Sequence, residues 1–360
     1  MHRVRISVAA RSDVGRVRKN NEDSFTVTDL DSGTHLETGQ GSLDLDLGER
    51  GVLLAVSDGM GGHQAGEVAS ALVVESLRTS LQAAEAGGSI EQKISAAVRR
   101  ANTDVVQAAR TTQKQGMGAT LTAVFVHATE AYVAEVGDSR AYLVRSGRLR
   151  QITRDQSMVQ LMVEKGILSA EDAKHSSHKS VILQALGLAD EVRVAIGRLR
   201  CRRGDRLLIC CDGLSNALSD DDLKDLLSGN DPKTACDRMI ALANERGGED
   251  NLTAIVAHFD GAGLEPADPA ETAEAVEVLQ AFEPELGSTR GASAPAQQAP
   301  PAAAAPPPAK AEPAPPEKAL SGRPPEAALP TPSPKGKRGW LLPIVLLGLA
   351  LIVVLYLFSR

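Results

Sequence analysis

Two stretches of the sequence place an aspartate directly after a run of apolar residues. The first reads V-L-L-A-V-S-D-G over residues 52–59, and the second reads R-L-L-I-C-C-D-G over residues 206–213. A single Asp-Gly pair is most simply a hairpin turn. Both pairs, however, precede segments without strand character, so we expect Asp58 and Asp212 to project carboxylates from strand ends. Glycine also lets the backbone approach an ion and offer a carbonyl oxygen.

Further acidic residues stand beside other turn-like segments. They occur in R-K-N-N-E-D over residues 18–23, V-G-D-S-R over 136–140 and G-G-E-D-N over 247–251. Taken singly, each is most simply a solvated turn. Gathered in one place, their oxygens would form the surroundings that Mg²⁺ or Mn²⁺ prefers. The planar guanidinium of Arg18 suits a phosphate or a carboxylate.

The charge balance argues against a nucleic-acid partner. The net charge is −7, and the aromatic residues comprise one Trp, three Tyr and five Phe. Nucleic-acid surfaces are normally basic, and single strands need aromatic platforms for stacking. A metal or a basic partner suits this composition better.

The pattern of elements predicts an α+β fold with antiparallel sheets. Strand signals cover residues 3–9, 24–28, 52–57, 120–127, 131–136, 140–145, 206–211 and 252–259, and several of them alternate with the period 2 of antiparallel sheets. Helical patterns cover residues 67–85, a helix opening at the S-I-E-Q capping box of 89–92, and residues 220–227 and 232–247. The helices come in pairs instead of following every strand, which is typical of α+β layering.

The last hundred residues differ in composition from the rest. Residues 262–339 are rich in Pro and Ala and predict a disordered linker, whereas residues 1–261 predict one folded domain. Residues 340–358 contain no charged residue and are long enough to span a bilayer, although a buried helix is the alternative. Lys335, Lys337 and Arg338 precede this span, so we expect a single-pass cell-membrane protein with its N-terminal domain in the cytoplasm.

Seven short motifs occur in a fixed order along the first 260 residues. They are S-D-V-G-x-V-R-x-x-N-E-D (12–23), D-G-M-G-G-H-x-x-G-E-x-A-S (58–70), G-M-G-A-T-L (116–121), V-G-D-S-R-A-Y-L (136–143), T-R-D-Q-S (153–157), C-D-G-L-S (211–215) and E-D-N-L-T (249–253). This set strongly resembles the bacterial branch of the type 2C metal-dependent Ser/Thr protein phosphatases. The resemblance implies two antiparallel sheets packed as a sandwich with helix pairs outside, a four-layer α-β-β-α fold.

The resemblance also implies a role for each matching acidic residue. Asp58, the carbonyl of Gly59, Asp212 and Asp250 would bind two Mn²⁺ or Mg²⁺ ions, with Asp58 bridging them. The remaining implied roles are water-mediated metal binding by Glu22 and Asp23, a third, weaker metal at Asp138, and phosphate binding by Arg18. Two such ions would activate a water for in-line attack on phosphorus, so no protein nucleophile is required.

Cysteine chemistry is excluded as the source of a phosphatase activity. A thiol phosphatase needs an arginine six positions after its cysteine, and the four cysteines are followed there by other residues. Those residues are Leu207, Asn216, Ala217 and Leu242. The cysteines contain no C-x-x-C pair typical of zinc sites, so we interpret them as reduced thiols of an intracellular compartment.

Three histidines need separate interpretation. Animal members of the family often carry a histidine after the first Asp-Gly as a candidate general acid, but Met60 stands there in this chain. His63 lies later in the motif and is either near the site or structural. His175 and His178 fall in residues 155–190, a segment that resembles the variable flap of the family, and we interpret them as flap surface.

Together these observations predict a membrane-anchored protein phosphatase that dephosphorylates phosphoserine and phosphothreonine. Its partners would be phosphorylated cytoplasmic proteins, including Ser/Thr kinases and their substrates. Two alternatives stay open. One is an inactive phosphoprotein-binding module, and the other is a phosphatase acting on a regulator of transcription.

Overall fold

The computed structural model describes residues 3–36, 39–61, 64–84, 87–114, 116–174, 176–178, 180–268 and 276–284. All of them lie in the first of two compact units, Met1–Gln297. Among these described residues, no helix is both long and apolar enough to cross a membrane. The predicted span 340–358 and the predicted linker from residue 285 onward lie outside the described residues.

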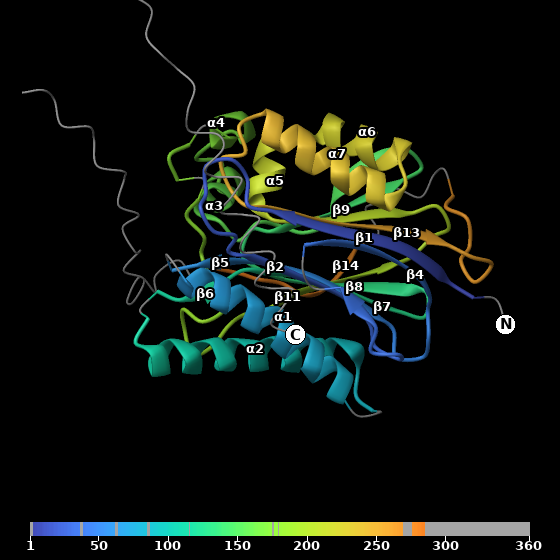
Figure 1. The fold of residues 1–360 in the computed structure, drawn as a ribbon, viewed down its shortest axis with the longest axis horizontal. Helices are drawn as coiled ribbons and strands as arrows, with labels where there is room; N and C mark the ends of the chain where they lie inside the picture. The colour runs from blue at the N-terminus through green and yellow to red at the C-terminus, as the bar shows by residue number, and fades with distance from the viewer. Residues whose placement is uncertain are drawn as a thin grey trace, which may run out of the picture. The chain divides into compact units, whose positions relative to one another are not determined.

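Two antiparallel sheets form the centre of this unit (Figure 1). The six-stranded sheet has the order β10 (Arg148–Gln151), β9 (Arg140–Arg145), β12 (Arg206–Cys210), β13 (Leu252–Asp260), β1 (Arg5–Asp13) and β4 (Gln40–Asp46). The eight-stranded sheet has the order β14 (Glu277–Gln280), β11 (Ala195–Arg200), β8 (Glu130–Val136), β7 (Leu121–His127), β5 (Val52–Met60), β2 (Asp23–Asp29) and β3 (His35–Leu36), with β6 (Gly118–Ala119) paired to β5.

Helices cover the outer face of each sheet. The eight-stranded sheet carries α1 (Gln64–Ala83) and α2 (Ile90–Thr112), and the six-stranded sheet carries α5 (Asp212–Ala217), α6 (Asp220–Gly229) and α7 (Pro232–Glu245). Two short helices, α3 (Met158–Glu164) and α4 (Ala170–Lys174), follow β10. The predicted α+β fold with four layers is therefore confirmed.

The helices begin where the sequence supplies capping residues. Ser89 and Ser219 form capping boxes at the starts of α2 and α6. The Asp231 side chain accepts from the backbone N–H of Thr234, and Pro232 occupies the first turn of α7. These caps satisfy backbone donors that have no partner inside the helix, and they fix the points at which the chain turns back over the sheets.

Apolar side chains fill the interfaces between layers. One buried cluster lies between the two sheets, where it includes Leu54, Val133 and Ile209, and it continues under α6 and α7. A second cluster, including Leu77 and Val98, lies between the eight-stranded sheet and the helices α1 and α2. Alternate residues of β5 and β8 belong to different clusters, since successive strand side chains point to opposite faces.

The structure extends one predicted strand and contains strands that were not predicted. The strand β5 continues through Met60 because Gly59 and Met60 pair with Ala119 and Gly118 of β6. Asp58 therefore lies inside a strand and not after it. The strands β4 and β11 were not predicted, and β14 lies within residues 262–339 that the composition predicts as linker. Since β14 pairs with β11, the folded unit extends beyond residue 261.

Candidate metal centre

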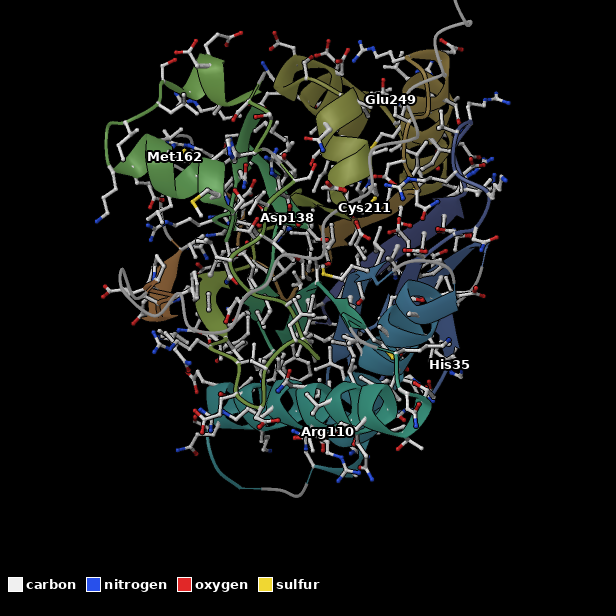
Figure 2. All side chains as sticks on the ribbon, turned by 90° about the vertical axis from the view of Figure 1, so that its left-hand side faces the viewer. His35, Arg110, Asp138, Met162, Cys211 and Glu249 are labelled. Atoms are coloured by element: carbon white, nitrogen blue, oxygen red, sulfur yellow. The ribbon has the colours of Figure 1, made fainter. Side chains whose placement is uncertain are left out.

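The predicted acidic residues come together at one end of the sandwich. Asp58 lies near the end of β5, Asp212 is the first residue of α5, just after β12, and Asp250 closely precedes β13. Asp23, the first residue of β2, is the antiparallel partner of Asp58. Figure 2 looks onto this end and shows Asp138 near Cys211, the residue before Asp212. The negative charge of Asp212 raises the pKa of Asp138, so these two carboxyl groups are also close. Five segments far apart in the sequence thus deliver carboxylates to one region.

Buried hydroxyl groups hold Asp58 and the Asp138 turn in place. The Asp58 N–H donates to Thr120 Oγ1 at 2.9 Å, and the Thr120 N–H donates to the Asp58 carbonyl at 2.8 Å. Thr120 Oγ1 also lies 2.9 Å from Ser139 Oγ, and the Ser57 hydroxyl donates to the Thr120 carbonyl at 2.6 Å. The network joins the end of β5 to the turn between β8 and β9, so the positions of Asp58 and Asp138 depend on each other.

Asp23 is a buried carboxyl with only one oxygen satisfied. Its Oδ2 accepts from the Thr253 hydroxyl at 2.7 Å, and its Oδ1 has no hydrogen-bond partner among the described residues. Burial raises the pKa of Asp23 to about 7, with smaller contributions from the charges of Asp212 and Asp250, and the Thr253 hydroxyl opposes the shift. An unpaired buried oxygen of this kind is costly unless a cation or donor approaches it.

The other carboxyls raise one another's pKa values. Burial raises the pKa of Asp58 well above its usual range, and the charges of Asp23 and Asp212 add to the shift. Burial likewise raises the pKa of Asp138, with the charge of Asp212 as the next cause. The pKa of Asp212 is raised by burial and by the charge of Asp250. Like charges this close are costly unless cations compensate them.

Arg18 is a cation beside this group. Its Nη2 donates to Asp250 Oδ2 at 2.8 Å, and the side chain is about half exposed. Burial opposes the charge on Arg18, but the carboxylates of Asp250, Glu22 and Asp58 outweigh it and raise the arginine pKa. A guanidinium has five N–H donors, so the bond to Asp250 leaves donors for a further oxyanion.

The loop that carries Arg18 is held by Asn251. The Asn251 amide donates to the carbonyls of Val14 at 3.0 Å and Asn20 at 2.9 Å, and its Oδ1 accepts from the Glu22 N–H at 2.8 Å. The same residue is buried, with 5% of its surface exposed. Asn251 therefore fixes residues 14–22 against the segment that provides Asp250.

Both Asp-Gly pairs require glycine because no side chain fits at Gly59 or at Gly213. A Cβ on Gly59 would collide with the Gly66 carbonyl and lie 2.7 Å from the Glu22 carbonyl. A Cβ on Gly213 would collide with the Asn251 carbonyl and come within 3.0 Å of Asp250 Cβ. Both glycines thus permit close approach of neighbouring backbone. Gly213 lies in the first turn of the helix α5 and not in an open turn.

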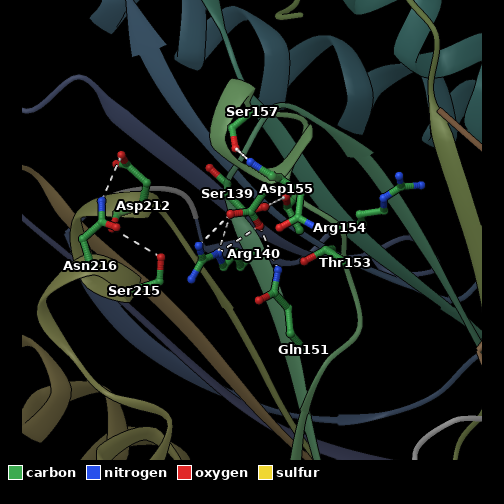
Figure 3. Close-up of polar contacts among 12 residues, drawn as sticks. Ser139, Arg140, Gln151, Thr153, Arg154, Asp155, Ser157, Asp212, Ser215 and Asn216 are labelled. Atoms are coloured by element: carbon green, nitrogen blue, oxygen red, sulfur yellow. Dashed lines mark hydrogen bonds and ion pairs between the residues drawn. The ribbon is translucent and has the colours of Figure 1, made fainter. Parts of the chain in front are cut away.

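A salt bridge supports the Asp138 side of the region. Arg140 donates to Asp155 through Nε at 2.9 Å and through Nη2 at 2.6 Å (Figure 3). Gln156, the next residue, accepts from the Gly137 N–H at 2.9 Å through its Oε1. The T-R-D-Q-S motif therefore has a supporting role, because its residues hold the turn that carries Asp138 in place.

Of His63, His175 and His178, the structure describes only His178. His63 and His175 lie outside the described residues. His178 is exposed, and its Nδ1 lies 3.4 Å from Ser177 Oγ. Its position agrees with the interpretation as flap surface.

The oxygen donors have the chemistry that Mn²⁺ or Mg²⁺ requires. Carboxylates dominate the region, one buried oxygen lacks a partner among the described residues, and burial together with neighbouring carboxylates raises the pKa values of Asp58 and Asp138. Within the described ranges, however, no group of three or more His, Cys, Asp or Glu side chains is arranged to hold a metal ion. The carboxylates of the described residues therefore share one region without forming a closed ligand cage.

Several positioning residues were not singled out from the sequence. They are Thr120, Ser139, Gln156, Asn251 and Thr253. All five stand inside the motifs that carry the family resemblance. Apart from Gln156, each is a polar residue within or beside a strand pattern, which was the available signal that its side chain bonds to backbone or to a carboxylate.

A four-layer sandwich with carboxylates and one arginine at the same end is the arrangement that the sequence resemblance implies. The pattern of the protein phosphatase 2C family matches residues 37–257. The chain is 40% identical over 250 residues to the serine/threonine protein phosphatase PstP of Mycobacterium tuberculosis, covering 69% of this chain and 44% of that protein. It is 33% identical to the serine/threonine phosphatase stp of Listeria monocytogenes, covering 69% of this chain and 94% of that protein. The chain belongs to the protein phosphatase 2C family.

Solved structures support the same relationship. The crystal structure of the Mycobacterium tuberculosis phosphatase PstP/Ppp matches with a TM-score of 0.61 and 38% identity, covering 72% of this chain and 99% of that one. The catalytic domain of PstP in complex with two manganese ions matches with a TM-score of 0.60 and 37% identity, covering 71% and 99%. The matched part spans less than half of the full-length PstP sequence.

Proposed function

We propose that this chain is a protein phosphatase that hydrolyses phosphoserine and phosphothreonine with the help of Mn²⁺ or Mg²⁺. The observation that carries the proposal is the convergence of Asp58, Asp212 and Asp250 at one end of the sandwich, with Arg18 bonded to Asp250. Family membership and the two manganese ions of the related PstP catalytic domain support it.

In this proposal the residues have distinct roles. Asp58, the Gly59 carbonyl, Asp212 and Asp250 hold two ions, and Asp138 with Asp212 holds a third, weaker one. The other acidic residues, Glu22 and Asp23, act through bound water. When bound, the ions supply an activated water and neutralise charge on the phosphoryl group.

Arg18 would orient the substrate phosphate. Its exposed guanidinium stands beside Asp250, and its remaining N–H donors can bind two phosphate oxygens in a fork. Asn251 and the backbone of Gly248 hold the loop, because the Gly248 carbonyl accepts from the Arg16 N–H at 2.7 Å. The loop therefore presents Arg18 at a fixed place relative to the carboxylates, which is what in-line attack requires.

The proposal is tested with phosphoserine, phosphothreonine and phosphotyrosine peptides of one sequence, each with Mn²⁺ or with a chelator. We expect metal-dependent hydrolysis of the first two, and loss of at least ~100-fold in kcat for Asp212→Ala. Asp221→Ala, which removes an exposed carboxylate of α6, is the matched control and should leave kcat unchanged. Peptide binding without turnover would identify a phosphoprotein-binding module instead.

We further propose that residues 340–358 anchor the chain in the cell membrane, with residues from about 285 to 339 as a linker and the catalytic unit in the cytoplasm. The uncharged stretch and the preceding lysines and arginine support this assignment. Anchoring would raise the concentration of the enzyme near membrane-bound kinases and their substrates. Full-length protein should sediment with membranes and a chain ending at residue 339 should not, whereas equal distribution of the two would contradict the anchor.

A further inference from the structure

A cavity of about 310 Å³ lies at the flank of the sandwich, apart from the carboxylates described above. Its walls come from β8, from the segment between β10 and α3, from α3, from β11, and from β14 with the residues after it. Much of the lining is apolar, including Val133, Ala195, Val276 and Phe282. This volume lies at the lower end of the range for small-molecule sites.

One buried carboxyl group in this wall has an unused oxygen. Glu135 is 4% exposed and lies on the same face of β8 as Val133. Its Oε2 accepts from the Arg154 N–H at 3.0 Å, whereas its Oε1 has no hydrogen-bond partner among the described residues. Burial raises the pKa of Glu135 well above the usual range.

The other charged groups of the wall already have partners. Asp155 pairs with Arg140, and Glu164 pairs with Arg154 (Figure 3 shows Arg140, Asp155 and Arg154). The side chains of Arg150 and Arg154 are exposed and so belong to the rim, whereas Glu135 belongs to the buried part. A neutral glutamine could accept the Arg154 N–H equally well, so that bond alone gives no reason for a carboxyl group here.

We propose that this cavity is a binding site for a small molecule with an apolar body and one cationic nitrogen, an amine or an amidine, which donates to Glu135 Oε1. The apolar lining would bury the body, and the carboxylate would pair with the cation. Pairing satisfies the unused oxygen and removes the cost of leaving the carboxyl alone in apolar surroundings.

The site is separate from the proposed metal centre but shares a supporting segment with it. Gln156 lines the cavity and also holds the turn of Asp138 through its bond to the Gly137 N–H. None of the proposed metal ligands lines the cavity. Binding can therefore be measured without any phosphatase assay, and its failure would not bear on the proposed function.

The test uses the full chain and three probes of similar shape, namely benzamidine, benzamide and benzoate, measured by ligand-detected NMR and calorimetry. We expect benzamidinium to bind at least ~10-fold more tightly than benzamide and benzoate not to bind, because only the cation complements a carboxylate. Glu135→Gln should remove the preference for the cation. Glu164→Gln, which changes a wall carboxylate that already has a partner, should keep it.

A second variant separates loss of the site from loss of the fold. Ala195→Phe adds a ring to a residue of β11 that lines the cavity and should abolish binding of benzamidine while Glu135 stays intact. Thermal unfolding identifies any variant that fails to fold. If either Glu135→Gln or Ala195→Phe does not fold, the other variant tests the binding site. Absence of benzamidine binding, equal binding of benzoate, or unchanged selectivity in Glu135→Gln would overturn the proposal.

Discussion

Replacement of Asn251 by alanine should lower the free energy of unfolding and, in addition, lower catalytic activity because Arg18 is no longer held in place. The Asn251 side chain makes three hydrogen bonds to backbone groups of residues 14–22, at 2.8, 2.9 and 3.0 Å. At about 1 kcal/mol for each buried bond, Asn251→Ala should lower the free energy of unfolding by about 3 kcal/mol. Native domains are stable by about 5–15 kcal/mol, so the variant should still fold.

Asn102 provides a matched control far from the carboxylates. Its buried amide also makes three bonds to backbone groups, at 3.0 Å to the Ala189 carbonyl, 3.1 Å to the Asp190 carbonyl and 2.8 Å from the Gly187 N–H. Asn102→Ala should therefore cost a similar free energy of unfolding. It should leave kcat/KM unchanged, whereas Asn251→Ala should lower kcat/KM by about 10–100-fold because Arg18 is no longer held.

The assay combines urea unfolding with steady-state hydrolysis of a phosphothreonine peptide at saturating Mn²⁺ and at a temperature where both variants are folded. Misplacement of the phosphate-binding loop should raise KM at least as much as it lowers kcat. Wild-type kinetics in folded Asn251→Ala, or an equal loss of activity in Asn102→Ala, would refute the argument that the amide positions Arg18.

Three further changes have expected outcomes. Gly59→Ala should prevent folding or abolish activity, because its Cβ would lie 2.7 Å from the Glu22 carbonyl, whereas Gly229→Ala at the end of α6 meets nothing within 4 Å and should leave the melting temperature unchanged or higher. Arg145→Met should lower the free energy of unfolding by about 3–5 kcal/mol, measured in urea, because it leaves Asp205, 2% exposed, as an unpaired buried charge. Burial lowers the pKa of His258 from 6.5 to about 4, so the unfolded chain binds the proton first and stability should fall as pH decreases from about 6.5 towards 4. In urea titrations at several pH values, His258→Gln should lose stability less steeply over this interval, and an identical slope would contradict the assignment.

Elements with strong periodicity were predictable from the sequence, and edge elements were not. The apolar runs of β5, β7 and β12 follow from burial on both faces, and the caps at Ser89 and Ser219 mark the helix starts. By contrast, β4 alternates leucines with aspartates at the edge of its sheet. This alternation is a strand signal, but glycine and aspartate are depleted in strands, and the pairing with β1 that provides the backbone bonds is a long-range contact.

The strand β14 illustrates the same limit more sharply. Its four residues follow a stretch rich in Pro, Ala and Glu, and Val278 is 68% exposed. The strand is stabilised by pairing with β11 and by the salt bridge from Arg198 to Glu277 at 2.6 Å. Composition alone therefore predicts linker at a place where tertiary contacts form a strand.

The candidate site was predictable as a set of residues but not as a geometry. The order of the motifs identifies Asp58, Asp212 and Asp250, and the topology then brings them to one end of the sandwich. The hydroxyl of Thr120 and the amide of Asn251 act through contacts across 62 and 229 positions of sequence. Such contacts have no local periodicity, so a single sequence does not reveal which polar residues make them.

The count of bound Mn²⁺ ions, taken together with turnover, tests the central claim most directly. Electron paramagnetic resonance titration of the full chain should give two tightly bound Mn²⁺ ions, and the same samples should hydrolyse the phosphothreonine peptide. Asp212→Asn should lose at least one ion and the hydrolysis together, whereas Asp221→Asn should lose neither. Retention of both ions and of full activity in Asp212→Asn would contradict the account.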